Sequence, residues 1–125
     1  MKLASTRIVT KNVPALAAFY EKITQIPPVG TDTYVEIRTP GSVLAIADEE
    51  SVKRNNAGAA IAASNHTMIL EFEVADVDVE RARLSSFITH WVLEPTNQPW
   101  GNRSMLFRDP DGNLINFYTP IHGPK

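Results

Sequence analysis

The side chains of this chain that are best suited to chemistry are one arginine and two glutamates. Arg7 lies in a run of polar and β-branched residues, Ser5 to Thr10, that is typical of a strand. Glu71 and Glu73 lie in a second such run, Thr67 to Val74. Because side chains alternate along a strand, the two glutamates share one face. A carboxylate there could accept a proton, and a guanidinium could bind an anionic or carbonyl group.

The composition removes several other chemistries. The chain has no cysteine, which excludes disulfides, thiolate metal sites and cysteine nucleophiles. Its histidines are His66, His90 and His122, and no second ligand stands near any of them at a spacing typical of metal sites. His90 is expected at a helix end, and a surface or hydrogen-bonded role is favoured for all three histidines. The sequence predicts neither a metal nor a cofactor.

Length and charge bound the class of protein. A chain of 125 residues with 43% apolar and 21% charged residues is typical of one compact domain. The formal net charge is -2 without a basic stripe, so we expect no nucleic-acid partner. The longest uncharged run, Asn55 to Leu70, contains too many polar residues to cross a membrane, and the N-terminus lacks the apolar segment of a secretory signal. The expected location is the cytoplasm.

The first half of the chain predicts the elements that would position Arg7. After the strand Ser5 to Thr10, Asn12 caps a helical pattern that runs from Val13 to Ile23. Two short strand-like runs follow, Tyr34 to Arg38 and Ser42 to Ala47, with the turn Thr39-Pro40-Gly41 between them. The stretch from Ser51 to Ala63 is rich in Ala, Asn, Ser and Gly and is interpreted as a connector, although it could form a helical turn.

The second half repeats this order. At an offset of about 64 residues, Ser5 falls on Ile69, Arg7 on Glu71 and Asn12 on Asp76. A helical pattern after Asp76 carries apolar residues at Val77, Leu84 and Ile88. The strands expected after it are Val92 to Glu94, Arg103 to Arg108 and Asn113 to Thr119. Each half is therefore a strand, a helix and two or three further strands.

The motifs of this repeat resemble a known family. Phe19-Tyr20 lies on the first helix, and Asp109-Pro110-Asp111-Gly112-Asn113 precedes the last strand. With two copies of the unit, these residues resemble the vicinal oxygen chelate superfamily, which joins glyoxalase I, extradiol dioxygenases and bleomycin-resistance proteins. The segment Trp100-Gly101-Asn102-Arg103 is most similar to the bleomycin-resistance branch. The resemblance covers about Leu3 to Thr119.

The resemblance implies a fold and an assembly. The expected fold class is α+β, a single domain over residues 1–125 built of a module at 3–48, a connector at 49–65 and a module at 66–119. Each module is a βαβββ unit, and the curved mixed or antiparallel sheets enclose a cleft with the helices outside. The resemblance also implies a homodimer that completes the cleft. It does not imply a reaction.

The resemblance further implies where a metal would be held. The metal enzymes of the superfamily place His, Glu or Gln at positions that correspond here to Ser5, Ile69, Asn116 and a fourth near Ala45. None of these residues is a strong ligand for a divalent cation. Metal-dependent glyoxalase or dioxygenase activity is therefore disfavoured. The Asp-Pro-Asp-Gly segment is interpreted as a turn, in which proline fixes one dihedral angle and glycine takes the left-handed position.

Other side chains are expected to line the cleft. Alternation puts Arg7 on the same face as Ser5, and Glu71 and Glu73 on the same face as Ile69. Arg7 and Glu71 could form an ion pair that joins the modules, or they could bind a ligand. Trp100 lies on a turn, where contact with a ligand or with a second chain is equally plausible. Tyr118 and Asn116 share a strand face, and Tyr118 is either an ordinary half-buried aromatic or a ligand contact.

Three functions follow from these residues. The leading hypothesis is a metal-free protein that binds a small planar or amphipathic molecule in an aromatic-lined cleft, with a role in sequestration or resistance. An alternative is a metal-independent lyase or isomerase with Glu71 or Glu73 as base and Arg7 as partner of an oxyanion. A third is a purely structural dimer module. The predicted ligand contacts are Ser5, Arg7, Ile69, Glu71, Trp100, Asn116 and Tyr118.

Overall fold

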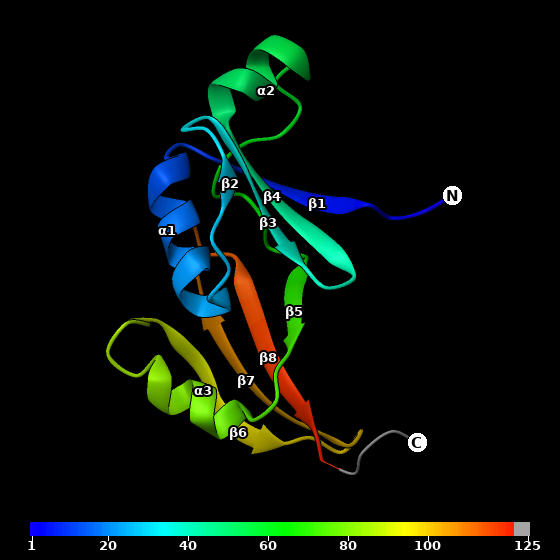
Figure 1. Ribbon diagram of the computed structural model, residues 1–125, viewed down its shortest axis with the longest axis vertical. Coiled ribbons are helices and arrows are strands. Elements are labelled where there is room, and N and C mark those ends of the chain that lie inside the picture. The colour runs from blue at the N-terminus through cyan, green and yellow to red at the C-terminus, as the bar shows by residue number, and fades with distance from the viewer. Residues whose placement is uncertain (122–125) are drawn as a thin grey trace. The chain divides into compact units, whose positions relative to one another are not determined.

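The computed structural model describes residues 1–121 and divides into two compact units (Figure 1). The first unit is Met1–Ser64, and the second begins at Asn65. Each unit holds a four-stranded sheet, with strand order β1-β4-β3-β2 in the first and β5-β8-β7-β6 in the second. The predicted α+β fold of two repeated modules is confirmed. Among the described helices, none is long and apolar enough to span a membrane.

The first unit follows the predicted order closely. β1 runs parallel to β4, whereas β3 is antiparallel to both β4 and β2. The two-residue strand β2 is the strand of the predicted βαβββ module that the sequence did not locate, because so short a run has no periodicity. The elements of this unit are β1 (Ser5–Thr10), α1 (Val13–Thr24), β2 (Val29–Gly30), β3 (Tyr34–Thr39), β4 (Ser42–Asp48) and α2 (Glu49–Asn55).

The helix α1 buries one face of the first sheet. Asn12 caps it by accepting a hydrogen bond from Ala15 N at 3.1 Å, and its apolar side, including Leu16 and Tyr20, is buried. The helix contacts β3 and β4, whose Ile37 and Ile46 are fully buried. Burial of each such aliphatic side chain stabilises the unit by roughly 2 kcal/mol.

The stretch interpreted as a connector contains a helix. Asp48 caps α2, since its carboxylate accepts a hydrogen bond from Ser51 N at 2.8 Å. Acidic residues fill the first turn and basic residues the last, which favours the helix dipole. Val52 is only 1% exposed and provides the buried anchor of this helix. With a single apolar anchor the helix has no periodic pattern, which is why the sequence did not predict it.

The second unit differs from the prediction between its helix and its second strand. The helix ends at Arg83, and the buried Leu84 and Ile88 lie in the turns that follow. His90 is therefore not at a helix end but in the loop before β6, where its carbonyl accepts a hydrogen bond from Arg108 N. The elements are β5 (Ile69–Glu73), α3 (Val77–Arg83), β6 (Trp91–Asn97), β7 (Asn102–Arg108) and β8 (Leu114–Pro120).

Aromatic rings form the core of the second unit. Phe117 packs edge-on against Phe72 and Phe107, with ring centroids 5.6 and 5.2 Å apart. Trp91 extends the chain of rings through Phe107 at 5.6 Å, and the Arg81 guanidinium lies 3.8 Å from the Trp91 ring centroid. These aromatic residues occupy one face of the sheet, which leaves the alternate residues of β5, β7 and β8 on the other.

Candidate functional site

The candidate site is the face of the second sheet that turns away from the aromatic core. Residues paired directly across neighbouring strands share a face, so the register of β5, β8 and β7 arranges these side chains in rows. We call this surface the open face. Its first row is Ile69, Leu114 and Arg108, its second is Glu71, Asn116 and Leu106, and its third is Glu73, Tyr118 and Ser104.

The third row holds a phenol beside a carboxylate. Tyr118 lies directly opposite Glu73 in the parallel pair of β8 and β5. Burial raises the pKa of the Tyr118 phenol, and the charges of Glu73 and Glu71 and a hydrogen bond to Glu73 raise it further. Tyr118 is therefore a protonated hydrogen-bond donor at neutral pH. Ser104, at the other end of the row, accepts a hydrogen bond from Gln98 Nε2 at 3.3 Å.

The second row contains an acceptor that lacks a donor. Asn116 Oδ1 is buried and has no hydrogen-bond partner in the part of the chain that the structure describes. A buried carbonyl oxygen without a donor costs roughly 1–3 kcal/mol. Its row neighbour Glu71 is exposed, and within the second unit no described arginine or lysine forms an ion pair with Glu71 or Glu73. This part of the open face is rich in acceptors and carries negative charge.

The first row ends in a pocket. The pocket has a volume of about 170 Å³ and lies where Ile69, Leu114 and Arg108 meet the loop before β5. The Arg108 guanidinium is half-buried, and its Nη1 donates a hydrogen bond to the carbonyl of Gly112 at 2.9 Å. The residues that line the pocket are Asn65, His66, Thr67, Met68, Ile69, Arg108 and Leu114.

Hydrogen bonds fix the walls of this pocket. The Asn65 side chain accepts hydrogen bonds from Thr67 N and Met68 N, and its Nδ2 donates to Asn113 Oδ1 at 3.1 Å. Asn113 Nδ2 in turn donates to the buried Asp109 carboxylate at 2.8 Å. The loop before β5 is thus tied to the turn before β8.

That turn is the predicted Asp-Pro-Asp-Gly turn. The Asp109 carboxylate also accepts hydrogen bonds from the backbone nitrogens of Asp111 and Asn113, both at 2.9 Å. Gly112 has a φ of +86°, the left-handed conformation that favours glycine. Asp109 therefore acts within the turn, and the turn presents the Gly112 carbonyl to Arg108.

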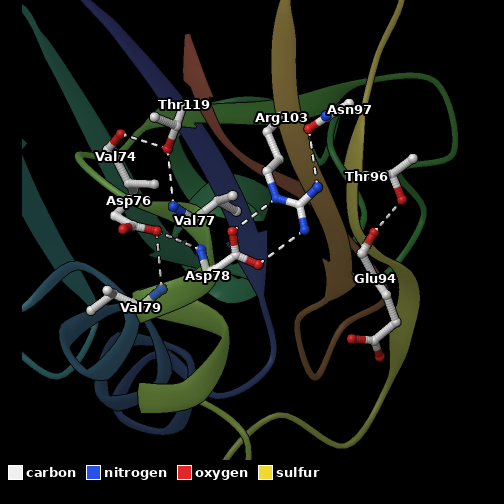
Figure 2. A network of polar contacts seen from close by, with 10 residues as sticks. All are labelled: Val74, Asp76, Val77, Asp78, Val79, Glu94, Thr96, Asn97, Arg103 and Thr119. Atoms are coloured by element: carbon white, nitrogen blue, oxygen red, sulfur yellow. Dashed lines mark hydrogen bonds and ion pairs between the residues drawn. The ribbon is translucent and has the colours of Figure 1, made fainter. Parts of the chain in front are cut away.

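A second network fixes the opposite end of the open face (Figure 2). Thr119 Oγ1 accepts a hydrogen bond from Val77 N and donates one to Val74 O, both at 3.0 Å. Two nitrogens of Arg103 on β7 bond the two carboxylate oxygens of Asp78 on α3, at 2.8 and 3.1 Å. This arginine holds the pKa of the Asp78 carboxyl below its usual range. The network joins α3 to β7 and β8 next to Tyr118.

The corresponding face of the first sheet is already internally paired. Glu36 accepts hydrogen bonds from the Tyr34 hydroxyl at 2.9 Å and from Arg38 Nε at 3.0 Å. Arg7 lies beside Ala45 in the register and donates from Nη2 to Asn56 Oδ1 at 3.1 Å. Arg38 is therefore paired with a carboxylate within this unit, whereas the described hydrogen bond of Arg7 is to a neutral amide oxygen.

The predicted site residues fall into three places. Ile69, Glu71, Asn116 and Tyr118, together with Glu73, share the open face. Trp100 is 67% exposed in the loop between β6 and β7. Ser5 and Arg7 lie on β1 of the first unit, both exposed. The pairing of Arg7 with Glu71 would join two different units and stays a prediction.

Three residues of the open face were not predicted. Ser104, Leu106 and Arg108 project from β7 on the side opposite to the buried Met105 and Phe107. Alternation along β7 could have placed them on one face. The partner strand and its register, which bring them beside Asn116 and Tyr118, cannot be read from that local pattern.

The donor set at the expected metal positions does not fit a metal centre. Ala45 and Ile69 carry no donor atom, Ser5 offers a hydroxyl, and Asn116 offers one amide oxygen. Within residues 1–121, no three His, Asp or Glu side chains gather as a metal site would require. His66 and His90 are exposed, and His122 lies outside the described residues. The side chains at these four positions are therefore too weak a donor set to hold the metal that the superfamily's enzymes use.

Comparison with known proteins agrees with this architecture. The sequence pattern of the Glyoxalase/Bleomycin resistance protein/Dioxygenase superfamily matches residues 2–117. A search of curated proteins gives no match.

Solved structures share the fold at low sequence identity. A glyoxalase/bleomycin resistance protein/dioxygenase from Nocardioides has a TM-score of 0.81 at 20% identity, over 100% of this chain and 87% of that one. A family enzyme from Burkholderia phytofirmans PsJN has a TM-score of 0.81 at 16% identity, over 96% and 99% of the two chains.

A lactoylglutathione lyase from Agrobacterium tumefaciens has a TM-score of 0.72 at 21% identity, over 94% of this chain and 92% of that one. At these identities the structures establish the fold alone. The match of the superfamily pattern along nearly the whole sequence establishes more: this chain belongs to the Glyoxalase/Bleomycin resistance protein/Dioxygenase superfamily, the vicinal oxygen chelate proteins.

Proposed function

We propose that this protein binds a small planar or amphipathic molecule on the open face of its second unit, without a metal centre. The observation that carries the proposal is the buried Asn116 Oδ1, which has no donor among residues 1–121 and lies beside the exposed Glu71. A ligand that donates a hydrogen bond there removes the cost of an unpaired buried acceptor. We further propose a role in sequestration or resistance, as in the bleomycin-resistance-like branch of the superfamily.

The chemistry of the open face defines what the ligand must offer. Glu71, Glu73 and Asn116 accept hydrogen bonds, so the ligand carries donors or a cationic group on that side. Leu106, opposite Asn116 on β7, and Leu114, two residues before Asn116 on β8, provide apolar surface next to these acceptors. The rings of Tyr118 and Trp100 are the aromatic surfaces on which a planar ligand would stack. Ser5 and Arg7, which lie in the first unit, stay predictions from the sequence as further ligand contacts.

The test uses benzamidine, a planar cation with several donors. Isothermal titration calorimetry should detect its binding in the millimolar range, and Glu73→Gln and Asn116→Leu should each weaken it by about fivefold or more. Asn55→Ala is the control, because this exposed residue at the end of α2 in the first unit belongs to no part of the proposed site, and it should leave the affinity unchanged. Absence of binding, or equal affinity in all variants, would contradict the proposal. A thermal-shift screen of planar metabolites and antibiotics would then identify the physiological ligand.

The metal-free state is a separate part of the proposal. The expected metal positions Ser5, Ala45, Ile69 and Asn116 provide no set of strong donors. Elemental analysis of dialysed protein should therefore find no stoichiometric zinc, nickel or iron. One such ion per chain, retained through dialysis, would refute this part alone.

An alternative activity is a metal-independent lyase or isomerase. The placement of the Tyr118 phenol opposite Glu73 favours it, because a carboxylate beside a protonated phenol could pass a proton to and from a substrate. Glu71 or Glu73 would remove a proton from the carbon next to a carbonyl, and the sequence predicts Arg7 as the partner of the resulting enolate oxygen. The same carbon skeleton would then regain the proton at another position.

Deuterium exchange tests this alternative. Hydroxyacetone incubated with the protein in D₂O should lose its carbon-bound protons from the NMR spectrum, and Glu71→Gln with Glu73→Gln should abolish the exchange. Exchange that proceeds equally with the double variant would exclude these residues as the base.

We also propose that the protein is a cytoplasmic homodimer, with neither nucleic acid nor membrane as a partner. β6 is an edge strand of the second sheet and exposes Val92 at 45%, which a second chain could cover. Light scattering at micromolar concentration should give the mass of two chains, and a stable monomer would contradict this. Trp100→Ala would reduce the mass if Trp100 contacts the second chain, and would weaken ligand binding if it contacts the ligand.

A further inference from the structure

We propose that the pocket of the first row binds a carboxylate group, with Arg108 as its anchor. The inference rests on the proposed ligand-binding function and narrows the ligand to a small planar carboxylate. Arg108 differs from the other arginines of the second unit in its partner. Arg81, Arg83 and Arg103 each bond a carboxylate, those of Glu94, Glu80 and Asp78 respectively.

Arg108 has no such partner among the described residues. Its side chain donates to the Gly112 carbonyl from Nη1, and the carbonyl carries no net charge. A guanidinium offers five donors in a planar fork, and one hydrogen bond leaves most of them available. Because the side chain is half-buried and lines a pocket, its free donors can meet a carboxylate with little water between them. The charge of Arg108 thus selects an anion.

The rest of the pocket selects an apolar body. Met68 and Ile69 are 58% and 47% exposed, although both are large and apolar, and Leu114 completes this surface. The pocket volume of about 170 Å³ is close to the roughly 150 Å³ of a cavity that accepts benzene. An aromatic ring with one carboxylate therefore fits both the size and the chemistry of the pocket.

The pocket is built before a ligand arrives. Asn65 uses its side-chain amide to hold the loop over Thr67 and Met68, and the bond from Asn65 to Asn113 fixes the loop against the turn. The same turn holds Arg108 through Gly112. Because the walls and the anchor are fixed by one connected network, little ordering is required on binding.

The second row of the open face defines what the far end of the ligand should carry. Residues two apart on a strand are separated by about 6.8 Å, so Asn116 and Glu71 lie about one ring length from the first row. A planar ligand with its carboxylate at Arg108 would place a donor at its opposite end beside Asn116 Oδ1. The ligand class is therefore a planar carboxylate with a hydrogen-bond donor at its far end.

Benzoate and benzyl alcohol form the test pair, since they share a ring and differ in charge. Calorimetry should show that benzoate binds the wild-type protein in the millimolar range and that Arg108→Gln weakens it by about tenfold or more. Benzyl alcohol should bind the two proteins within about twofold of each other. Arg108→Lys should give an intermediate loss for benzoate, because lysine keeps the charge without the fork.

Arg38→Gln is the matched control, because Arg38 takes the corresponding place in the first sheet and is exposed. It should leave benzoate binding unchanged, and circular dichroism should show that both arginine variants are folded. Benzoate that binds Arg108→Gln as tightly as wild type would overturn the inference. So would a wild-type protein that does not bind benzoate at about 20 mM.

The two proposals fail separately. If benzamidine binds and responds to Glu73→Gln while benzoate does not bind, the carboxylate pocket is wrong and the proposed function stands. If benzoate binds through Arg108 while benzamidine does not bind, the acceptor-rich rows are wrong and the pocket stands. Failure of both ligands would overturn both proposals.

Discussion

Arg38 and Arg108 occupy equivalent positions in the two sheets, yet only Arg38 bonds a carboxylate. Arg38 pairs in register with Val43 and through it with Ser5, as Arg108 pairs with Leu114 and through it with Ile69. Two residues before Arg38 stands Glu36, whose Oε1 lies 3.0 Å from Arg38 Nε. Two residues before Arg108 stands Leu106 instead. The repeat thus keeps the arginine and loses its partner in the second unit.

This difference predicts the effect of Leu106→Glu. The new carboxylate would stand to Arg108 as Glu36 stands to Arg38, and would compete with an anionic ligand for the guanidinium. Calorimetry should show benzoate binding weakened by about fivefold or more. Leu106→Gln is the control for the size of the side chain and should weaken benzoate binding by about twofold or less. Equal losses in the two variants would show that the added charge does not act on Arg108.

Tyr118 should titrate at an alkaline pH above that of an ordinary tyrosine. Burial, followed by the charges of Glu73 and Glu71, raises its pKa above the usual value of about 10. A difference titration of phenolate absorbance, wild type minus Tyr118→Phe, isolates this residue. The midpoint should exceed pH 10 and should fall in Glu73→Gln, because one source of negative charge is removed. An unchanged midpoint in Glu73→Gln would show that the carboxylate does not act on the phenol.

The two aspartates of the Asp-Pro-Asp-Gly turn should differ in their contribution to stability. Asp109→Ala removes a buried acceptor of two backbone hydrogen bonds and one from Asn113, and should cost about 3 kcal/mol of unfolding free energy. The Oδ2 atom of Asp111 is buried without a hydrogen-bond partner among the described residues, so Asp111→Ala should leave stability unchanged or raise it by up to about 1 kcal/mol. Urea unfolding measures both. The reverse order would contradict the assigned roles.

The ion pair between Asp78 and Arg103 should make the free energy of unfolding depend on pH in the acidic range. The hydrogen-bonded Arg103 lowers the pKa of Asp78 in the folded state. The ion pair therefore stabilises the fold fully above the pKa that Asp78 has in the unfolded chain, and this stabilisation is lost as the pH falls through the pKa of the folded state. The unfolding free energies of wild type and Asp78→Asn, measured in urea, should therefore approach each other as the pH falls below the ordinary aspartate pKa of about 3.9. Asp78 is exposed and Arg103 is half-buried, so the difference in unfolding free energy above pH 5 should be small and should shrink with salt. A difference that persists in acid would point to another cause.

The parts of the fold that were predicted depend on local signals. Asn12 and Asp76 cap their helices as expected, because a cap is defined by the residues that follow it. The strand Ser5–Thr10 was predicted to the residue by its side-chain types. The repeat at an offset of about 64 residues also indicated the second module, because its strand, helix cap and helix start recur in the same order and spacing.

The parts that were missed depend on tertiary context. β6 is longer than predicted because Pro95, which argues against a strand, lies on an edge strand at a register shift. Arg108 was passed over because its lack of a carboxylate partner becomes visible only when β7 is paired with β8. A local pattern identifies Glu71 and Tyr118 as candidates, but only the register shows which residues share their face.

If the open face of the second unit binds a planar ligand, an NMR titration should locate that ligand there. The ligand 4-(aminomethyl)benzoate carries a carboxylate and a donor at opposite ends of one ring. Added to uniformly ¹⁵N-labelled protein up to about 10 mM, it should shift the amide signals of Ile69, Arg108 and Asn116 the most. Shifts confined to other residues, or no shifts at all, would show that the open face does not bind this ligand.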